Sequence, residues 1–141
     1  MLRKSLLIAG FAVLMAGTAS AATEKFHATL SPGAEVPPSQ SAGSGEATAS
    51  LDTVTRELSY DVTFKGFSSG VTAAHIHGPA PAGKNAGVVA PLGTAPKSPI
   101  HGTVKLTEEQ EHQLSSGMLY VNIHSKNNPG GAVRGQLTPV K

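Results

Sequence analysis

The sequence predicts an all-β sandwich or barrel with one short helix, built as a single domain. Several short segments alternate apolar and polar residues with the period of a half-buried strand, and Gly- and Pro-rich turns separate them. One further segment has the capping pattern of a helix start. The alternative, an open α+β sheet, would need more helical pattern than this one segment supplies.

The first 21 residues have the pattern of an export signal. Arg3 and Lys4 form a charged start, residues 6–16 are apolar, and Ala19-Ser20-Ala21 matches the small-x-small pattern that a signal peptidase cuts. A retained membrane anchor is the alternative, but the apolar run is shorter than the roughly 20 residues that cross a bilayer. We therefore expect a signal peptide over residues 1–21, a mature domain over residues 22–141, and a periplasmic or secreted protein without a membrane attachment after cleavage.

Charge and cysteine content exclude several classes of function. Without Arg3 and Lys4 the chain has nine basic and nine acidic residues, so its formal net charge falls from +2 to zero. No basic field is left to indicate nucleic acid or an anionic membrane as a partner. The chain has no cysteine, which excludes thiolate ligands, thiol nucleophiles and disulfides.

The first half of the chain predicts four strands. The segment 57–64 is the clearest, because Leu58, Tyr60, Val62 and Phe64 share one face and polar residues occupy the other. A Pro-, Ser- and Gly-rich loop is expected over residues 31–45. The strands are expected at residues 26–30, 46–51, 57–64 and 71–77.

The second half predicts one helix and three further strands. Residues 78–99 contain five prolines and four glycines, which indicates a long surface loop with a short strand near Val88 and Val89. Thr107-Glu108-Glu109-Gln110 has the form of a capping box, so a helix should run to about Ser115 and end at Gly117. The strands are expected at residues 100–106, 119–124 and 133–137, with a tight turn at 127–131 before the last one.

Three histidines are predicted to share one polar face. His75 and His77 alternate with the apolar Ile76, so both imidazoles lie on the same side of their strand. In the later strand Leu119, Val121 and Ile123 are apolar, which leaves Tyr120, Asn122 and His124 on the opposite face. If both strands belong to one sandwich, His75, His77 and His124 form a metal site suited to zinc, copper, nickel or iron.

The remaining candidates have competing interpretations. His27 fits a surface position, and His112 fits a solvated helix face. His101 starts the strand after the long loop and could return to the metal as a fourth or bridging ligand. Arg134 is either a structural arginine that ties turn carbonyls together or a cation that faces the metal and attracts a small anion. Neither a G-x-S-x-G elbow nor a nucleotide-binding glycine pattern occurs.

At these residues the chain resembles the CHRD family, which is named after chordin and includes single-domain exported bacterial proteins. The resemblance runs from about Phe26 to Thr138. The chain departs from the family at Ala132. The family usually has Glu at this position, directly before the hydrophobic residue and the Arg of the last motif. The motifs that carry the resemblance are Leu30-Ser31-Pro32-Gly33-Ala34-Glu35-Val36-Pro37-Pro38, Ala73-Ala74-His75-Ile76-His77, Tyr120-Val121-Asn122-Ile123-His124 and Gly131-Ala132-Val133-Arg134-Gly135-Gln136-Leu137.

The same segments are more distantly similar to copper/zinc superoxide dismutase, which implies a Greek-key β-sandwich. By that similarity His75, His77 and His124 correspond to copper ligands and Arg134 to the residue that guides the anion. His101 lies near the region of the bridging histidine, although its local pattern does not match. The zinc-site histidines and aspartate, and the disulfide, have no counterparts in this chain.

Three functions are compatible with these residues. The first is an exported metal-binding β-sandwich, with copper as the expected ion and zinc as the alternative, in metal handling or redox protection. The second is a copper-dependent enzyme similar to superoxide dismutase. The third is an interaction module, as in chordin, in which the histidines are only structural. The residues indicate a metal ion as a partner, and they point to no particular protein partner.

Overall fold

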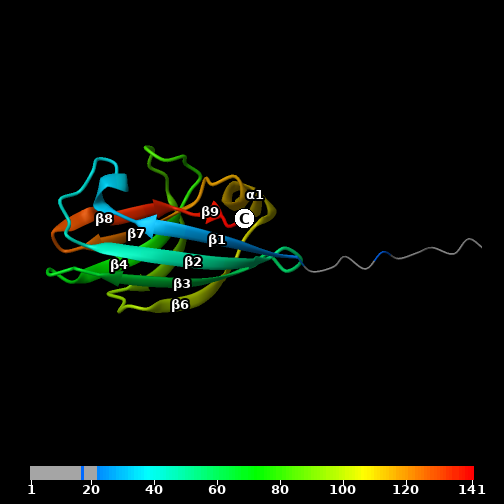
Figure 1. Ribbon diagram of the computed structural model, residues 1–141, viewed down its shortest axis with the longest axis horizontal. Helices are drawn as coiled ribbons and strands as arrows, with labels where there is room; N and C mark the ends of the chain where they lie inside the picture. Colours follow the sequence, from blue (N-terminus) through cyan, green and yellow to red (C-terminus); the bar gives the residue numbers. More distant parts are fainter. Residues whose placement is uncertain (1–16, 18–21) are drawn as a thin grey trace, which may run out of the picture.

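Two antiparallel β-sheets lie face to face in the computed structural model, which describes Gly17 and residues 22–141 (Figure 1). Sheet A has five strands in the order β6-β3-β2-β1-β9, and sheet B has four in the order β5-β4-β7-β8. This arrangement, with its single α-helix among the described residues, confirms the predicted all-β sandwich. The elements are β1 (Thr23–Leu30), the 3-10 helix η1 (Pro32–Ala34), β2 (Ser44–Asp52), β3 (Glu57–Lys65), β4 (Val71–His77), β5 (Val88–Thr94), β6 (Ile100–Lys105), α1 (Glu108–Ser115), β7 (Tyr120–Ser125), β8 (Asn128–Gln136) and β9 (Thr138–Pro139).

The expected leader over residues 1–21 lies outside the described residues, apart from Gly17. The signal peptide, and the division of the chain at residue 21, therefore stay predictions. In the part of the chain that the structure describes, no helix is long and apolar enough to cross a membrane.

The core lies between the sheets and contains the apolar positions that the alternation predicted. Leu58 and Val62 of β3 are fully buried, and so are Val121 and Ile123 of β7. Successive side chains of a strand point to opposite faces, so burial of these residues turns their polar neighbours outward. The face of sheet B that carries the predicted histidines is therefore its outer face.

Two connections cover part of this outer face: residues 31–43, between β1 and β2, and residues 78–87, between β4 and β5. Ser31 exchanges two backbone hydrogen bonds with Arg134 of β8, at 3.0 and 3.1 Å. The side-chain amide of Asn85 donates to the carbonyl of Val36 at 2.8 Å and joins the two connections. A layer of polar side chains is thereby enclosed between the sheet and the loops.

The helix forms where the capping box predicted it. The Thr107 hydroxyl accepts a hydrogen bond from the backbone of Gln110, and the Gln110 side chain accepts one from the backbone of Thr107. These two bonds satisfy amides that the first helical turn leaves without partners. The helix ends at Ser115, and its buried Leu114 attaches it to the core.

The strand boundaries differ most from the predictions at three places. β5 has seven residues, whereas only a short strand near Val88 was expected. Pro91 lies within β5, and this is tolerated because β5 is the outer strand of sheet B and needs no hydrogen bonds on its free side. β8 begins at Asn128, inside the expected turn, and the two residues of β9 pair with β1 although no pattern indicated a strand there.

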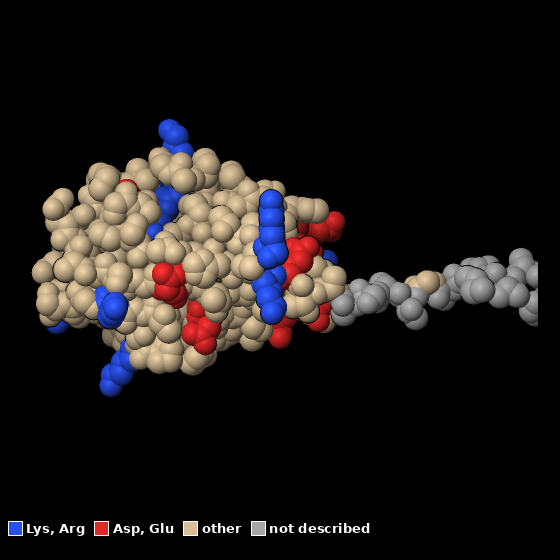
Figure 2. Space-filling view, in the orientation of Figure 1, with Lys and Arg blue, Asp and Glu red and all other residues tan. Residues whose placement is uncertain are grey.

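Basic and acidic side chains are both present on the face seen in Figure 2, and acidic groups gather at the end of the sandwich near α1. Three glutamates, Glu108, Glu109 and Glu111, lie in the first turn of that helix. Their charges are favourable there because the helix dipole is positive at its N-terminal end. That neither nucleic acid nor a membrane is a partner stays a prediction.

Candidate metal centre

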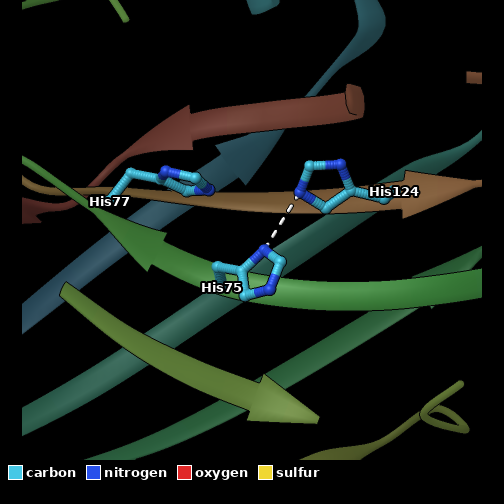
Figure 3. Close-up of side chains that lie close together, drawn as sticks. All are labelled: His75, His77 and His124. Carbon is cyan, nitrogen blue, oxygen red and sulfur yellow. Dashed lines mark hydrogen bonds between the residues drawn. The ribbon is translucent and has the colours of Figure 1, made fainter. Parts of the chain in front are cut away.

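The three predicted histidines come together because β4 and β7 are neighbours in sheet B. His75 pairs with Asn122, and His124 pairs with Ala73, two residues before His75 on the same face. The nitrogens that His75, His77 and His124 offer to a metal all lie within 4.8 Å of one another. Figure 3 shows the three rings turned toward a common point. The register of the two strands therefore agrees with the side-chain alternation that predicted this cluster.

In His77 and His124, a hydrogen bond to a backbone carbonyl determines which ring nitrogen has the lone pair that can bind a metal. The Nδ1 of His77 lies 3.0 Å from the carbonyl of Ala86, and the Nδ1 of His124 lies 2.9 Å from the carbonyl of Pro129. A carbonyl oxygen can only accept, so each Nδ1 carries the proton and each Nε2 keeps its lone pair. This is the outer-shell arrangement that orients metal-binding imidazoles.

In His75 the nitrogen that faces the other rings is Nδ1, not Nε2. The Nδ1 of His75 lies 3.0 Å from the Nε2 of His124 (Figure 3). The Nε2 of His77 is buried and has no hydrogen-bond partner in the described part of the chain. Because His124 Nε2 keeps its lone pair, the Nδ1 of His75 carries a proton and donates it to this Nε2. A metal ion would replace that proton, and the donor set would then be His75 Nδ1, His77 Nε2 and His124 Nε2, of which the buried His77 lone pair has no hydrogen-bond partner in the described part of the chain.

The distance between two of the rings suits one ion. Metal–imidazole bonds are about 2.0–2.1 Å long, so two nitrogens on the same ion can be at most ~4.2 Å apart. The His75–His124 separation of 3.0 Å meets this limit. The three ligand atoms lie within 4.8 Å of one another, so any separation above this limit would have to shorten for one ion to contact all three rings.

Burial and neighbouring rings favour the neutral form of His75 and His77. Burial lowers the pKa of His75, and the neighbouring rings of His124 and His77 lower it further. Burial also lowers the pKa of His77, although its bond to the Ala86 carbonyl acts in the opposite direction. Neutral imidazole is the form that binds metals, so both rings favour binding at pH values where free imidazole is already protonated.

Tyr120 supports the cluster from the middle of sheet B. Its ring stacks on His77, with centroids 5.1 Å apart and planes 5° from parallel, and the Arg134 guanidinium carbon lies 3.4 Å from the Tyr120 centroid. The Tyr120 hydroxyl accepts a hydrogen bond from the amide of Ala86 at 3.0 Å and donates one to its carbonyl at 3.3 Å. Tyr120 thus positions both the His77 ring and the residue that orients it.

Arg134 makes the contacts of a structural arginine. It is 1% exposed and donates to the carbonyl of Pro81 at 3.3 Å and to the side chains of Asn85 and Gln136 at 3.2 and 2.8 Å. Two of these partners belong to the 78–87 connection that also carries the Ala86 carbonyl. The anion-binding role of Arg134 stays a prediction.

Glu35 is a buried acid that the sequence analysis did not single out. It is 6% exposed and accepts a hydrogen bond from the side-chain amide of Asn122. Burial raises the pKa of its carboxyl from 4.5 to about 7, against the opposing effects of the Arg134 charge and the Asn122 bond. In the sequence Glu35 stands within the first motif of the family resemblance, but an isolated acid in a Pro- and Gly-rich loop is typical of solvated turns.

The other histidines lie apart from the cluster. His27 pairs with Glu46 at 2.6 Å and His101 pairs with Asp61 at 2.6 Å, in both cases on sheet A. His112 lies in α1. None of them joins the three-histidine group that the described residues form, so His101 does not act as a fourth or bridging ligand in this structure.

Comparison with known families gives a match over most of the described chain. Residues 26–137 match the family described as CHRD domain. No match to a curated protein was found.

Proposed function

The chain belongs to the CHRD domain family, and from this premise we propose that it is an exported metal-binding β-sandwich protein that serves in metal handling or redox protection. Copper is the first ion that we propose, and zinc is the second. The donor set consists of three imidazoles, which suit both ions, and divalent copper stands above zinc in the general order of affinities.

The buried Nε2 of His77 supports this proposal most directly. A buried polar atom without a partner costs free energy, typically about 1–3 kcal/mol, and is uncommon in folded proteins. A metal ion between the rings would use this lone pair together with those of His75 and His124. The carbonyls of Ala86 and Pro129 would hold two of the rings in the required tautomer.

Metal handling is preferred over superoxide chemistry because of Arg134. A cation that guides an anion must be reachable from solvent, whereas this guanidinium is 1% exposed and donates to three acceptors of the protein. Redox catalysis is therefore the second candidate, favoured only by the partial exposure of the three rings, which would leave a bound ion within reach of a further ligand.

We also propose a location outside the cytoplasm, either periplasmic or secreted. The proposal rests on the charged, apolar and small-residue pattern of residues 1–21. N-terminal sequencing of the protein recovered from the native host tests it, and an intact Met1 in the mature protein would contradict it.

Calorimetric titration of the purified protein with Cu²⁺ and Zn²⁺ tests metal binding. We expect one ion per chain and, for His124→Ala, an affinity lower by at least ~100-fold, because loss of a ligand should exceed the roughly 10–100-fold effect of losing an outer-shell partner. The nitrogen hyperfine pattern of the Cu²⁺ electron paramagnetic resonance spectrum should lose one imidazole in the same variant.

The matched control is His101→Ala, which removes an exposed histidine of sheet A that pairs with Asp61. It should bind the metal as the unmodified protein does. Absence of binding, or an equal loss in both variants, would refute the proposal and favour an interaction module with structural histidines. Turnover of superoxide by the copper-loaded protein would instead favour the enzyme.

A further inference from the structure

A pocket of about 320 Å³ is lined by loops at the end of the sandwich away from α1, and these loops are on the left in Figure 1. Three segments far apart in the sequence line it: residues 40–42 before β2, residues 66–69 between β3 and β4, and residues 125, 127 and 128 around the β7–β8 turn. Its volume is near the lower end of the roughly 300–1,000 Å³ that small-molecule sites occupy.

The side chains around the pocket are polar and uncharged. The lining offers no charged side chain to neutralise a metal ion or a phosphate, so it suits a neutral ligand better. The polar lining also disfavours a purely apolar ligand, because such a ligand would displace water from these groups without replacing its hydrogen bonds. The polar lining consists of Gln40, Ser41, Ser68, Ser69, Ser125, Asn127 and Asn128, and the one aromatic side chain is Phe67.

Several of these groups have hydrogen-bonding capacity to spare. Among the described residues, the amide groups of Gln40 and Asn127 and the hydroxyl of Ser68 make no hydrogen bond. The hydroxyls of Ser41 and Ser69 accept from the backbone amides of Gly43 and Asn127 at 2.9 and 3.4 Å, which leaves their protons free to donate. The pocket thus offers both donors and acceptors at its surface.

The walls are held in place before any ligand arrives. The amide of Lys126 donates to the carbonyl of Gly70 at 3.3 Å and joins two of the segments. The Phe67 ring lies against Gly43, where an added Cβ would come within 2.5 Å of it, and also makes an edge contact with Phe64 at 5.5 Å between centroids. Pre-ordered walls lower the entropy cost of binding.

We propose that this pocket binds a neutral sugar unit of a glycan. Each sugar hydroxyl both donates and accepts, as do the hydroxyl and amide side chains of the pocket. The C–H face of a sugar ring is apolar and can lie on an aromatic ring such as Phe67. No residue of the pocket belongs to the three-histidine cluster, so the proposal does not depend on metal binding.

Titration of the ¹⁵N-labelled protein with maltotriose, cellotriose and tri-N-acetylchitotriose, followed by NMR, tests this proposal. At least one saccharide should shift the amide signals of Ser68, Ser69 and Asn127 in a saturable manner, with a Kd on the order of 1 mM because the pocket is small and open. The double variant Ser68→Ala/Asn127→Ala should bind at least ~10-fold more weakly through the loss of two hydrogen bonds.

Ser59→Ala is the matched control, because it removes an exposed serine of β3 outside the pocket. It should leave the Kd unchanged. The proposal is overturned if none of the saccharides shifts the three signals, if the shifts map to another surface, or if the peptide Ala-Gly-Ala shifts them equally well. In the last case the pocket recognises peptide groups.

Discussion

Replacement of Glu35 by glutamine should change how the stability of the protein depends on pH. Burial holds the pKa of the Glu35 carboxyl at about 7 in the folded protein, compared with 4.5 for an unperturbed group. Between these two values the unfolded chain has released its proton and the folded chain still holds it. The free energy of unfolding must therefore fall as the pH rises through this interval.

The size of the effect follows from the displacement of the pKa. Each pKa unit corresponds to about 1.4 kcal/mol, so a change from 4.5 to about 7 gives at most roughly 3 kcal/mol. In the Glu35→Gln variant the new amide would stay neutral at every pH and could still accept the hydrogen bond from Asn122. The variant should match the unmodified protein near pH 4.5 and be more stable than it above pH 7, by up to that amount.

Urea unfolding followed by far-UV circular dichroism, at about pH 5, 6, 7 and 8 with a chelator present, measures this difference. The contribution of the histidines cancels because both proteins contain them. Glu57→Gln, in which an exposed carboxylate of β3 is lost, controls for the removal of one negative charge. A stability difference that does not change with pH would refute the reasoning. A variant that becomes less stable as the pH rises would show that the attraction of Arg134 outweighs burial.

Three further predictions concern the metal cluster and the backbone. Metal affinity should fall on acidification because protons compete with the metal for the imidazole nitrogens, and burial lowers the pKa of His75 and His77, so these two rings should be protonated only at a lower pH than free imidazole; calorimetry across the pH range measures the fall. Gly131→Ala should destabilise the protein by more than ~2 kcal/mol in urea unfolding, since φ at this residue is +143° and the new Cβ would lie 2.5 Å from the Glu35 carboxylate. Gly130→Ala is the control and should be nearly neutral, because open space surrounds the new Cβ. Thr107→Ala should lower the melting temperature through a loss of about 1 kcal/mol, and Thr107→Ser should restore most of it because the hydroxyl cap returns.

The sequence predicted those parts of the fold and the site that depend on neighbouring residues. The two-residue period of β3 and β7 indicated which side chains enter the core, and Leu58, Val62, Val121 and Ile123 are fully buried. The same period placed His75 and His77 on one face. The capping box located the helix start, because its two residues, Thr107 and Gln110, are only three positions apart in the sequence.

Only the tertiary structure decided which distant groups meet these side chains. The adjacency of β4 and β7 brings His75 and His124 to 3.0 Å, and the carbonyls of Ala86 and Pro129 select the tautomers of His77 and His124. Burial of Glu35 and Arg134 likewise depends on loops that close over sheet B. Side-chain alternation is set locally by the backbone geometry of an extended chain, whereas strand order, register and loop closure depend on the free energy of the whole packed molecule.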